Sequence, residues 1–163
     1  MKKTAEIEFS PAEALKVLGK SNRIKSRYNV LNKETRAEYT SADMELASKT
    51  LLFQYIGKKS MAEGAIERAQ LKKDIKAICH DLAGQGIYVP IDFRPYCDEL
   101  YSEKIDHNIA WLQTVGIVDI ISGPRYALTD SGKYEYFHPE KSIYSTKIPL
   151  ELLKEIEKSL EMI

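Results

Sequence analysis

The chain has 163 residues, of which 44% are hydrophobic and 29% are charged, and its 24 basic side chains balance 24 acidic ones. This composition is typical of a water-soluble protein of one domain or two small ones. There is no apolar run of about 18 residues and no apolar segment after Met1, so we expect no transmembrane helix, no membrane partner and no secretory signal. We therefore expect a cytoplasmic protein in which Cys79 and Cys97 are free and mostly buried.

The charges are unevenly distributed along the chain. Residues 1–91 carry 16 Lys/Arg against 11 Asp/Glu, whereas residues 92–147 carry 6 against 9 and residues 148–163 carry 2 against 4. Seven basic side chains between residues 16 and 36 are opposed only by Glu34. Such a local excess is typical of a phosphate-binding surface, although a solvated helix face is the alternative. The candidate DNA contacts in this segment are Lys20, Arg23, Lys25 and Arg27.

The first 60 residues are predicted to be mostly helical. A helix is expected from Ser10 to Leu18, because Ser10 suits an N-cap and the following proline suits the first turn. A second helix is expected over residues 22–31. A third begins at the capping signal of residues 40–43 and runs to about Ile56. Its inward-facing side chains are expected to be Met44, Leu51, Leu52 and Tyr55.

The order of these elements resembles the start of a MerR-type regulator over residues 10–60. A helix, a turn at Gly19, a second helix that carries Arg23 and Arg27, and a tyrosine-containing cap into a long helix follow one another. The chain departs from that pattern in the spacing between Gly19 and Ile24 and in the lack of glycine and proline in residues 32–39. A generic helical hairpin with a basic face is the other interpretation.

A long helix is predicted over residues 60–86. Its core-facing stripe consists of Ile66, Leu71, Ile75, Ile78 and Leu82. Residues 87–89 are strand-like, and Pro90 restricts them to an edge. A further helix is expected over residues 92–100, with Pro95 near its start.

Residues 102–136 carry the clearest local pattern. Ile105, Ile109, Leu112 and Val115 recur at helical spacing, and Gly116 ends that helix. The β-branched residues of 117–121 favour a strand, residues 122–124 a turn, and residues 125–128 a returning strand. Thr129 or Ser131 can then cap a following helix.

This stretch resembles the second half of a winged helix-turn-helix domain. The run of leucine, threonine, two further residues and glycine at Leu128, Thr129 and Gly132 carries most of the likeness, and we place the domain at 61–138. The expected fold is mainly α with a small β-hairpin (α+β), preceded by an N-terminal helical region, 1–60. The resemblance implies that the helix before the hairpin enters the major groove and that the wing meets the backbone. The implied DNA contacts are Lys104, His107 and Asn108 on the helix and Arg125 and Tyr126 on the wing.

The last segment, 139–163, is predicted to be a linker followed by an amphipathic helix. Its apolar side chains repeat at spacings of three, four and three, as in a coiled-coil seam. The helix is therefore expected either to dock on the body or to add to a dimer interface. The seam residues are Leu153, Ile156, Leu160 and Ile163.

No motif of a known catalytic or metal site emerges from the sequence. There is no glycine-rich phosphate loop, no zinc-protease helix motif and no paired CxxC, so we expect no enzyme activity and no cofactor. Cys79 and His80 are adjacent in a helix and diverge by roughly 100°, which opposes a shared metal ion. Trp111 is expected to pack against the hairpin, with an exposed partner anchor as the alternative.

Two functions remain open from the sequence. The first is a cytoplasmic DNA-binding protein, a transcriptional regulator or accessory factor that binds double-stranded DNA as a homodimer. The second is a winged-helix module that binds a protein partner and no DNA. The acidic charge of the winged-helix stretch favours the second, and the N-terminal cations favour the first.

Overall fold

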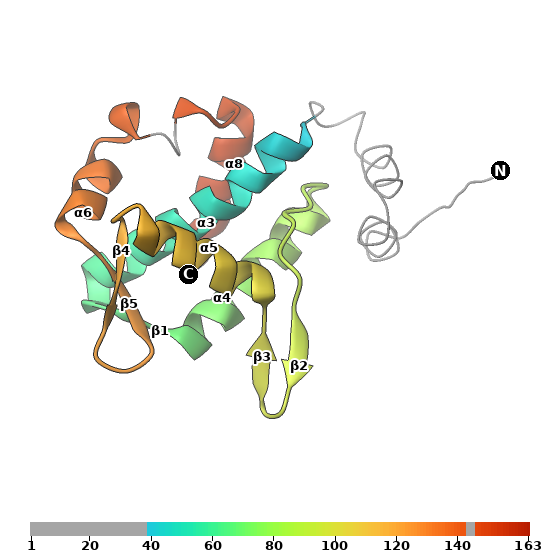
Figure 1. The fold of residues 1–163 in the computed structure, drawn as a ribbon. Coiled ribbons are helices and arrows are strands. Elements are labelled where there is room, and N and C mark those ends of the chain that lie inside the picture. Colours follow the sequence, from blue (N-terminus) through green and yellow to red (C-terminus); the bar gives the residue numbers. More distant parts are fainter. Residues whose placement is uncertain (1–38, 143–145) are drawn as a thin grey trace.

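The structure of the protein is a computed structural model that describes residues 39–142 and 146–163 (Figure 1). Strands β1 (Ile66–Glu67), β5 (Arg125–Leu128) and β4 (Val118–Ile121) form an antiparallel sheet in that order, and β2 (Arg94–Tyr96) pairs with β3 (Glu99–Tyr101) as a separate hairpin. The expected α+β class is confirmed. The helices predicted for residues 10–18 and 22–31 lie outside the described residues. The described helices are α3 (Ser41–Glu63), α4 (Arg68–Gly84), α5 (Glu103–Thr114), α6 (Asp130–Phe137), η1 (Pro139–Lys141, 3-10) and α8 (Leu150–Leu160).

Helix α3 is the central element of the core. It begins as predicted, because Thr40 accepts a hydrogen bond from the Asp43 backbone N–H and the Asp43 carboxylate accepts one from the Thr40 N–H. Leu51 and Phe53 are both buried although their side chains point to nearly opposite sides of the helix, about 160° apart. The helices α4, α5, α6 and α8 and the strand β5 all contact α3, so it is enclosed on most sides (Figure 1).

The predicted boundary between the third and fourth helices is wrong. We expected a helix to end near Ile56 and a second one to cover residues 60–86, but α3 continues to Glu63 and α4 begins only at Arg68. Gly57 lies within α3 and does not end it; the residue there is a glycine because the ring of Tyr136 occupies the space that a side chain would need. The helix ends instead at Gly64, whose φ of 87° suits glycine.

The short strand β1 is the element that the sequence pattern did not indicate. Ile66 pairs with Tyr126 and Glu67 with Arg125, which joins β1 to β5. Residues 87–89, predicted to be this strand, are buried but form no strand.

The helix expected over residues 92–100 is also wrong, since the β2–β3 hairpin takes its place and turns at Cys97, whose φ is +57°. The packing of β3 against α4 outweighs the local helical pattern there.

The elements predicted for residues 102–136 are confirmed as α5, β4, β5 and the start of α6. Ile105, Ile109 and Leu112 are buried as expected, whereas Val115 caps the helix and is exposed. Thr129 caps α6 by accepting a hydrogen bond from the Gly132 N–H at 3.0 Å. The sheet therefore leads directly into α6, which packs on α3.

The C-terminal helix α8 docks on the body of its own chain. Ile156 is fully buried, and the helix packs against α3 and α4. Ser159 donates a hydrogen bond to Asp81 at 2.8 Å, and Lys58 donates one to the Leu160 carbonyl at 2.6 Å. Of the two roles expected for this seam, docking on the body is the one that the structure shows, and the seam is not exposed for a dimer interface. Leu153, Ile156 and Leu160 are buried in this core, and Ile163 packs against it.

One hydrophobic core runs from α3 to α8. Leu51 of α3, Leu82 of α4 and Leu152 of α8 belong to it together with the sheet residues. The core thus crosses both predicted divisions of the chain, at residues 60/61 and 138/139. Among the described helices none combines the length and the apolar character that a membrane span requires.

Candidate interaction surface on helix α5

Helix α5 presents one apolar face to the core and one polar face to solvent. Ser102 caps it by accepting a hydrogen bond from the Ile105 N–H at 3.2 Å, which fixes where the helix begins after β3. Glu103, His107 and Ala110 lie at spacings of four and three and are exposed. This face is the one that a docking partner of α5 would meet.

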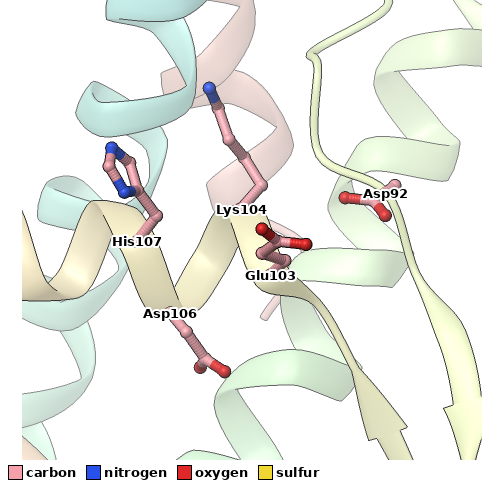
Figure 2. A pocket seen from close by; sticks show the side chains of 5 residues that line it. All are labelled: Asp92, Glu103, Lys104, Asp106 and His107. Atoms are coloured by element: carbon pink, nitrogen blue, oxygen red, sulfur yellow. The ribbon is translucent and has the colours of Figure 1, made fainter. Parts of the chain in front are cut away.

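A shallow hollow of about 600 Å³ lies beside the start of α5. Figure 2 shows that four of its lining side chains project from α5, and that Asp92 faces them from the segment before β2. Asp106 points toward α4, whereas Lys104 and His107 point toward other sides of the helix. Three carboxylates therefore surround the hollow against one lysine. Its lining consists of Asp92, Glu103, Lys104, Asp106 and His107.

Acidic partners engage the cations around this hollow. The Lys104 ammonium lies 2.6 Å from a carboxylate oxygen of Glu45 on α3. The ammonium of Lys72, a buried residue of α4, lies 3.3 Å from the Asp106 carboxylate. Glu103 and Asp106 lie in the first turn of α5, where the helix dipole favours negative charge. The solvent face of α5 therefore carries acidic charge, with no basic side chain that lacks an acidic partner.

The adjoining β2–β3 hairpin contributes an aromatic surface. Arg94, Tyr96 and Tyr101 line a second hollow of about 600 Å³. The Arg94 guanidinium lies 5.0 Å from the Tyr101 ring centroid, and the two tyrosine rings lie 6.2 Å apart. Tyr96 is 69% exposed, and Arg94 also reaches within 3.9 Å of Glu103. Tyrosine and arginine are enriched at energetically important interface positions. The sequence analysis missed these residues because it assigned the segment to a helix.

Asn108 does not have the role that was predicted for it. The residue is fully buried, and its amide donates a hydrogen bond to the Ser48 hydroxyl of α3 at 3.0 Å. It lies three residues after Ile105 and four before Leu112, so helical spacing alone placed it on the core face. Asn108 therefore cannot read a base edge from this position, whereas Lys104 and His107 do lie at the surface.

The structure also changes the roles predicted for the wing residues Arg125 and Tyr126. Tyr126 lies in β5 between β1 and β4 and is buried. Burial raises the pKa of its hydroxyl, and the neighbouring Arg68 acts in the opposite direction. Tyr126 is thus a core residue and not a DNA contact. Arg125 is half-exposed, and its Nε donates to the Ser122 carbonyl at 3.1 Å. The predicted contacts Lys20, Arg23, Lys25 and Arg27 lie outside the described residues.

The cysteines, metal-ligating side chains and tryptophan were also candidate sites. Both cysteines are free, but Cys97 is exposed at the hairpin turn, contrary to expectation, while Cys79 is half-buried. Within residues 39–142 and 146–163, no group of three or more His, Cys, Asp or Glu side chains is placed to hold a metal ion.

Trp111 packs partly against the core, and the Lys49 ammonium lies 5.3 Å from its ring centroid. The packed role thus fits Trp111 better than an exposed anchor.

Comparisons of the chain with protein-family models, with curated proteins and with solved structures find no match.

Proposed function

We propose that residues 41–128 form a winged helix whose α5 face binds a protein partner. The order of the elements supports this fold: helix α3, strand β1, helices α4 and α5, and the hairpin β4–β5 follow one another as in that family. The sheet order β1-β5-β4 joins the first strand to the hairpin. On this proposal the domain begins at residue 41 instead of 61, and the β2–β3 hairpin is an insertion between α4 and α5.

The observation that carries the functional proposal is the charge of α5. In a winged helix that reads DNA, this helix enters the major groove between two phosphate backbones. Here the exposed Glu103 would repel phosphate, Lys104 is held by Glu45, and Asn108 is buried. The described residues as a whole carry 15 Lys/Arg against 19 Asp/Glu. Binding of duplex DNA depends on Lys and Arg side chains at the contact surface that neutralise phosphates, and the α5 face offers only Lys104.

The chemistry of the surface indicates the class of partner. The hollow carries the exposed carboxylates of Asp92 and Glu103, which complement a basic side chain, and the exposed ring of Tyr96 on the adjoining hairpin offers a large apolar contact. The partner is therefore a protein surface with basic residues around an apolar or aromatic group.

Binding of DNA as a dimeric regulator is the second candidate function. One observation favours it: residues 1–38 contain nine Lys/Arg and five Asp/Glu, so the positive charge of the chain is concentrated there. On this alternative Lys20, Arg23, Lys25 and Arg27 provide most of the affinity, and the α5 face contributes little.

One set of full-length variants tests both functions. Glu103→Lys with Tyr96→Ala is expected to abolish capture of the partner from cells, since it reverses the charge and removes the exposed ring. The matched control Glu151→Lys, at an exposed position of α8, is expected to retain that partner. In parallel, the anisotropy of a labelled duplex at about 50 mM salt is expected to stay unchanged on adding wild-type protein.

The opposite results decide for the second candidate. Salt-sensitive duplex binding that Arg23→Glu with Arg27→Glu removes, and that the control Lys154→Glu with Lys158→Glu keeps, would replace the protein-binding proposal. Equal capture of the partner by the Glu103/Tyr96 variant and by the wild type would also contradict it.

A further inference from the structure

Strand β4 is an edge strand, and the register shows which of its backbone groups face outward. The Thr129 N–H donates to the Ile117 carbonyl at 2.9 Å, so these two residues form a hydrogen-bonded pair. Because such pairs alternate in an antiparallel ladder, Asp119 and Ile121 bond to β5. Val118 and Ile120 therefore direct their N–H and C=O groups away from the sheet. No backbone partner for these outward groups occurs among the described residues.

Apolar side chains surround this open edge. Ile120 is 50% exposed and Ile121 is 38% exposed, and Val115, just before the strand, is exposed as well. An open edge that carries exposed β-branched side chains is a template for pairing with another strand. Every other copy of this chain presents the same edge strand, so a second copy is a strand that this edge meets in any solution of the protein.

Asp119 counteracts this tendency in two ways. Its Oδ1 accepts a hydrogen bond from the Ile120 N–H at 2.9 Å, so the outward donor in the middle of the edge is already occupied. Its charge acts as well. In one of the antiparallel registers that a two-fold axis allows, outward Val118 pairs with Ile120 of the second copy. In that register the two Asp119 carboxylates lie directly opposite each other, where like charges destabilise the pair.

We propose that Asp119 is a guard residue that prevents β4 from pairing with the β4 strand of a second copy of the chain. This role is independent of the proposed partner at α5, because Asp119 lies on β4, does not line the acidic hollow, and involves only a second copy of the chain. Removal of the carboxylate frees the Ile120 donor and removes the repulsion in a single step.

Sedimentation equilibrium of the full chain at about 5–500 μM tests the proposal. Asp119→Ala is expected to tighten self-association by at least about tenfold relative to the wild type, the factor that about 1.4 kcal/mol corresponds to. Adding Ile120→Lys in the same chain is expected to reverse the effect. The control Asp98→Ala, at the turn of the other hairpin, is expected to behave as the wild type. Equal association of Asp119→Ala and the wild type would overturn the guard role.

Amide hydrogen exchange gives a second readout that does not depend on association. The measurement uses a concentration at which the wild type and Asp119→Ala sediment with the same mass. In the wild type the Ile120 amide is expected to exchange more slowly than the Val118 amide, and in Asp119→Ala this difference is expected to disappear. Asp119→Asn keeps an acceptor oxygen and is expected to preserve that protection. Equal exchange of the Ile120 and Val118 amides in the wild type would contradict the hydrogen bond on which the proposal depends.

Discussion

At the scale of single residues, the leucine-threonine-x-x-glycine run explains how the hairpin and α6 are held together. Thr129 accepts a hydrogen bond from the Gly132 N–H and donates one to the carbonyl of Gly116. The backbone carbonyl of Ile117 lies only 2.2 Å from where a Cβ on Gly132 would be. Gly132 is therefore required because β4 begins directly against α6, and the obstacle is backbone that cannot rotate away.

Gly132→Ala is predicted to destabilise the fold by about 2–3 kcal/mol, the usual cost of forcing an extra methyl group into a packed site. Urea unfolding followed by circular dichroism measures the change. Gly84→Ala is the matched control, because Gly84 also lies in a helix and a Cβ there would meet no atom within 4 Å. The control is expected to be neutral or slightly stabilising. Equal effects of the two substitutions would show that the close approach at Ile117 is unimportant.

At the scale of elements, the docking of α8 decides the role of the C-terminal seam. An isolated helix of 11 residues is marginal in water, so α8 depends on the face that it buries. That face meets α3 and α4, and the Ser159–Asp81 hydrogen bond fixes the helix beside the end of α4. The seam consequently stabilises the fold of one chain instead of joining two.

Ile156→Ala is predicted to lower the free energy of unfolding by about 3 kcal/mol, because it removes a fully buried side chain from the contact of α8 with the core. Glu157→Ala, the exposed neighbour, is expected to change it by less than about 0.5 kcal/mol. Denaturant unfolding gives both values. If Ile156→Ala changed the sedimenting mass of the folded protein and left its stability unaltered, α8 would be an interface after all.

At the scale of the whole molecule, the fold raises the pKa values of several weakly acidic side chains because it buries them. Burial raises the pKa of the Cys79 thiol from 9.0 to about 12. It also raises the pKa values of Tyr126 and Tyr136. The pKa of Tyr55 is raised by burial and then by its hydrogen bond to Asp74, at 2.6 Å. In each case folding favours the protonated form, so the unfolded chain loses these protons first as the pH rises.

These four groups are therefore predicted to add no pH dependence to the stability of the fold well below pH 9 and to lower that stability above this value, first through Cys79 and then through the tyrosines. Between pH 8 and pH 10, Cys79 alone is expected to account for about 1 kcal/mol of the loss. Urea unfolding of Cys79→Ala across this range is expected to show a correspondingly smaller decrease than the wild type. Cys97→Ala removes an exposed thiol and serves as the control. Identical pH dependence of all three proteins would contradict the burial of Cys79.

The sequence alone determined the elements whose signal is local. Helical spacing located α5 and α8, and capping residues located the start of α3 and α6. The β-branched residues and the turn at residues 122–124 located the β4–β5 hairpin. These predictions succeed because the period of a helix or strand and the geometry of a cap depend on residues within a few positions of each other. The same spacing puts Asn108 on the core face of α5, where it is buried, although the winged-helix resemblance led us to predict it as a DNA contact.

Only the tertiary structure decided which surfaces are buried and which short segments pair. The two residues of β1 carry no period of their own, and they are a strand only because β5 lies beside them. The β2–β3 hairpin exists where the local pattern favoured a helix, since β3 packs on α4. Likewise, an apolar seam on α8 fits a second chain or its own body equally well, and its packing against the apolar side chains of α3 and α4 decided the choice. Contacts between distant segments determine these outcomes, and a local pattern does not contain them.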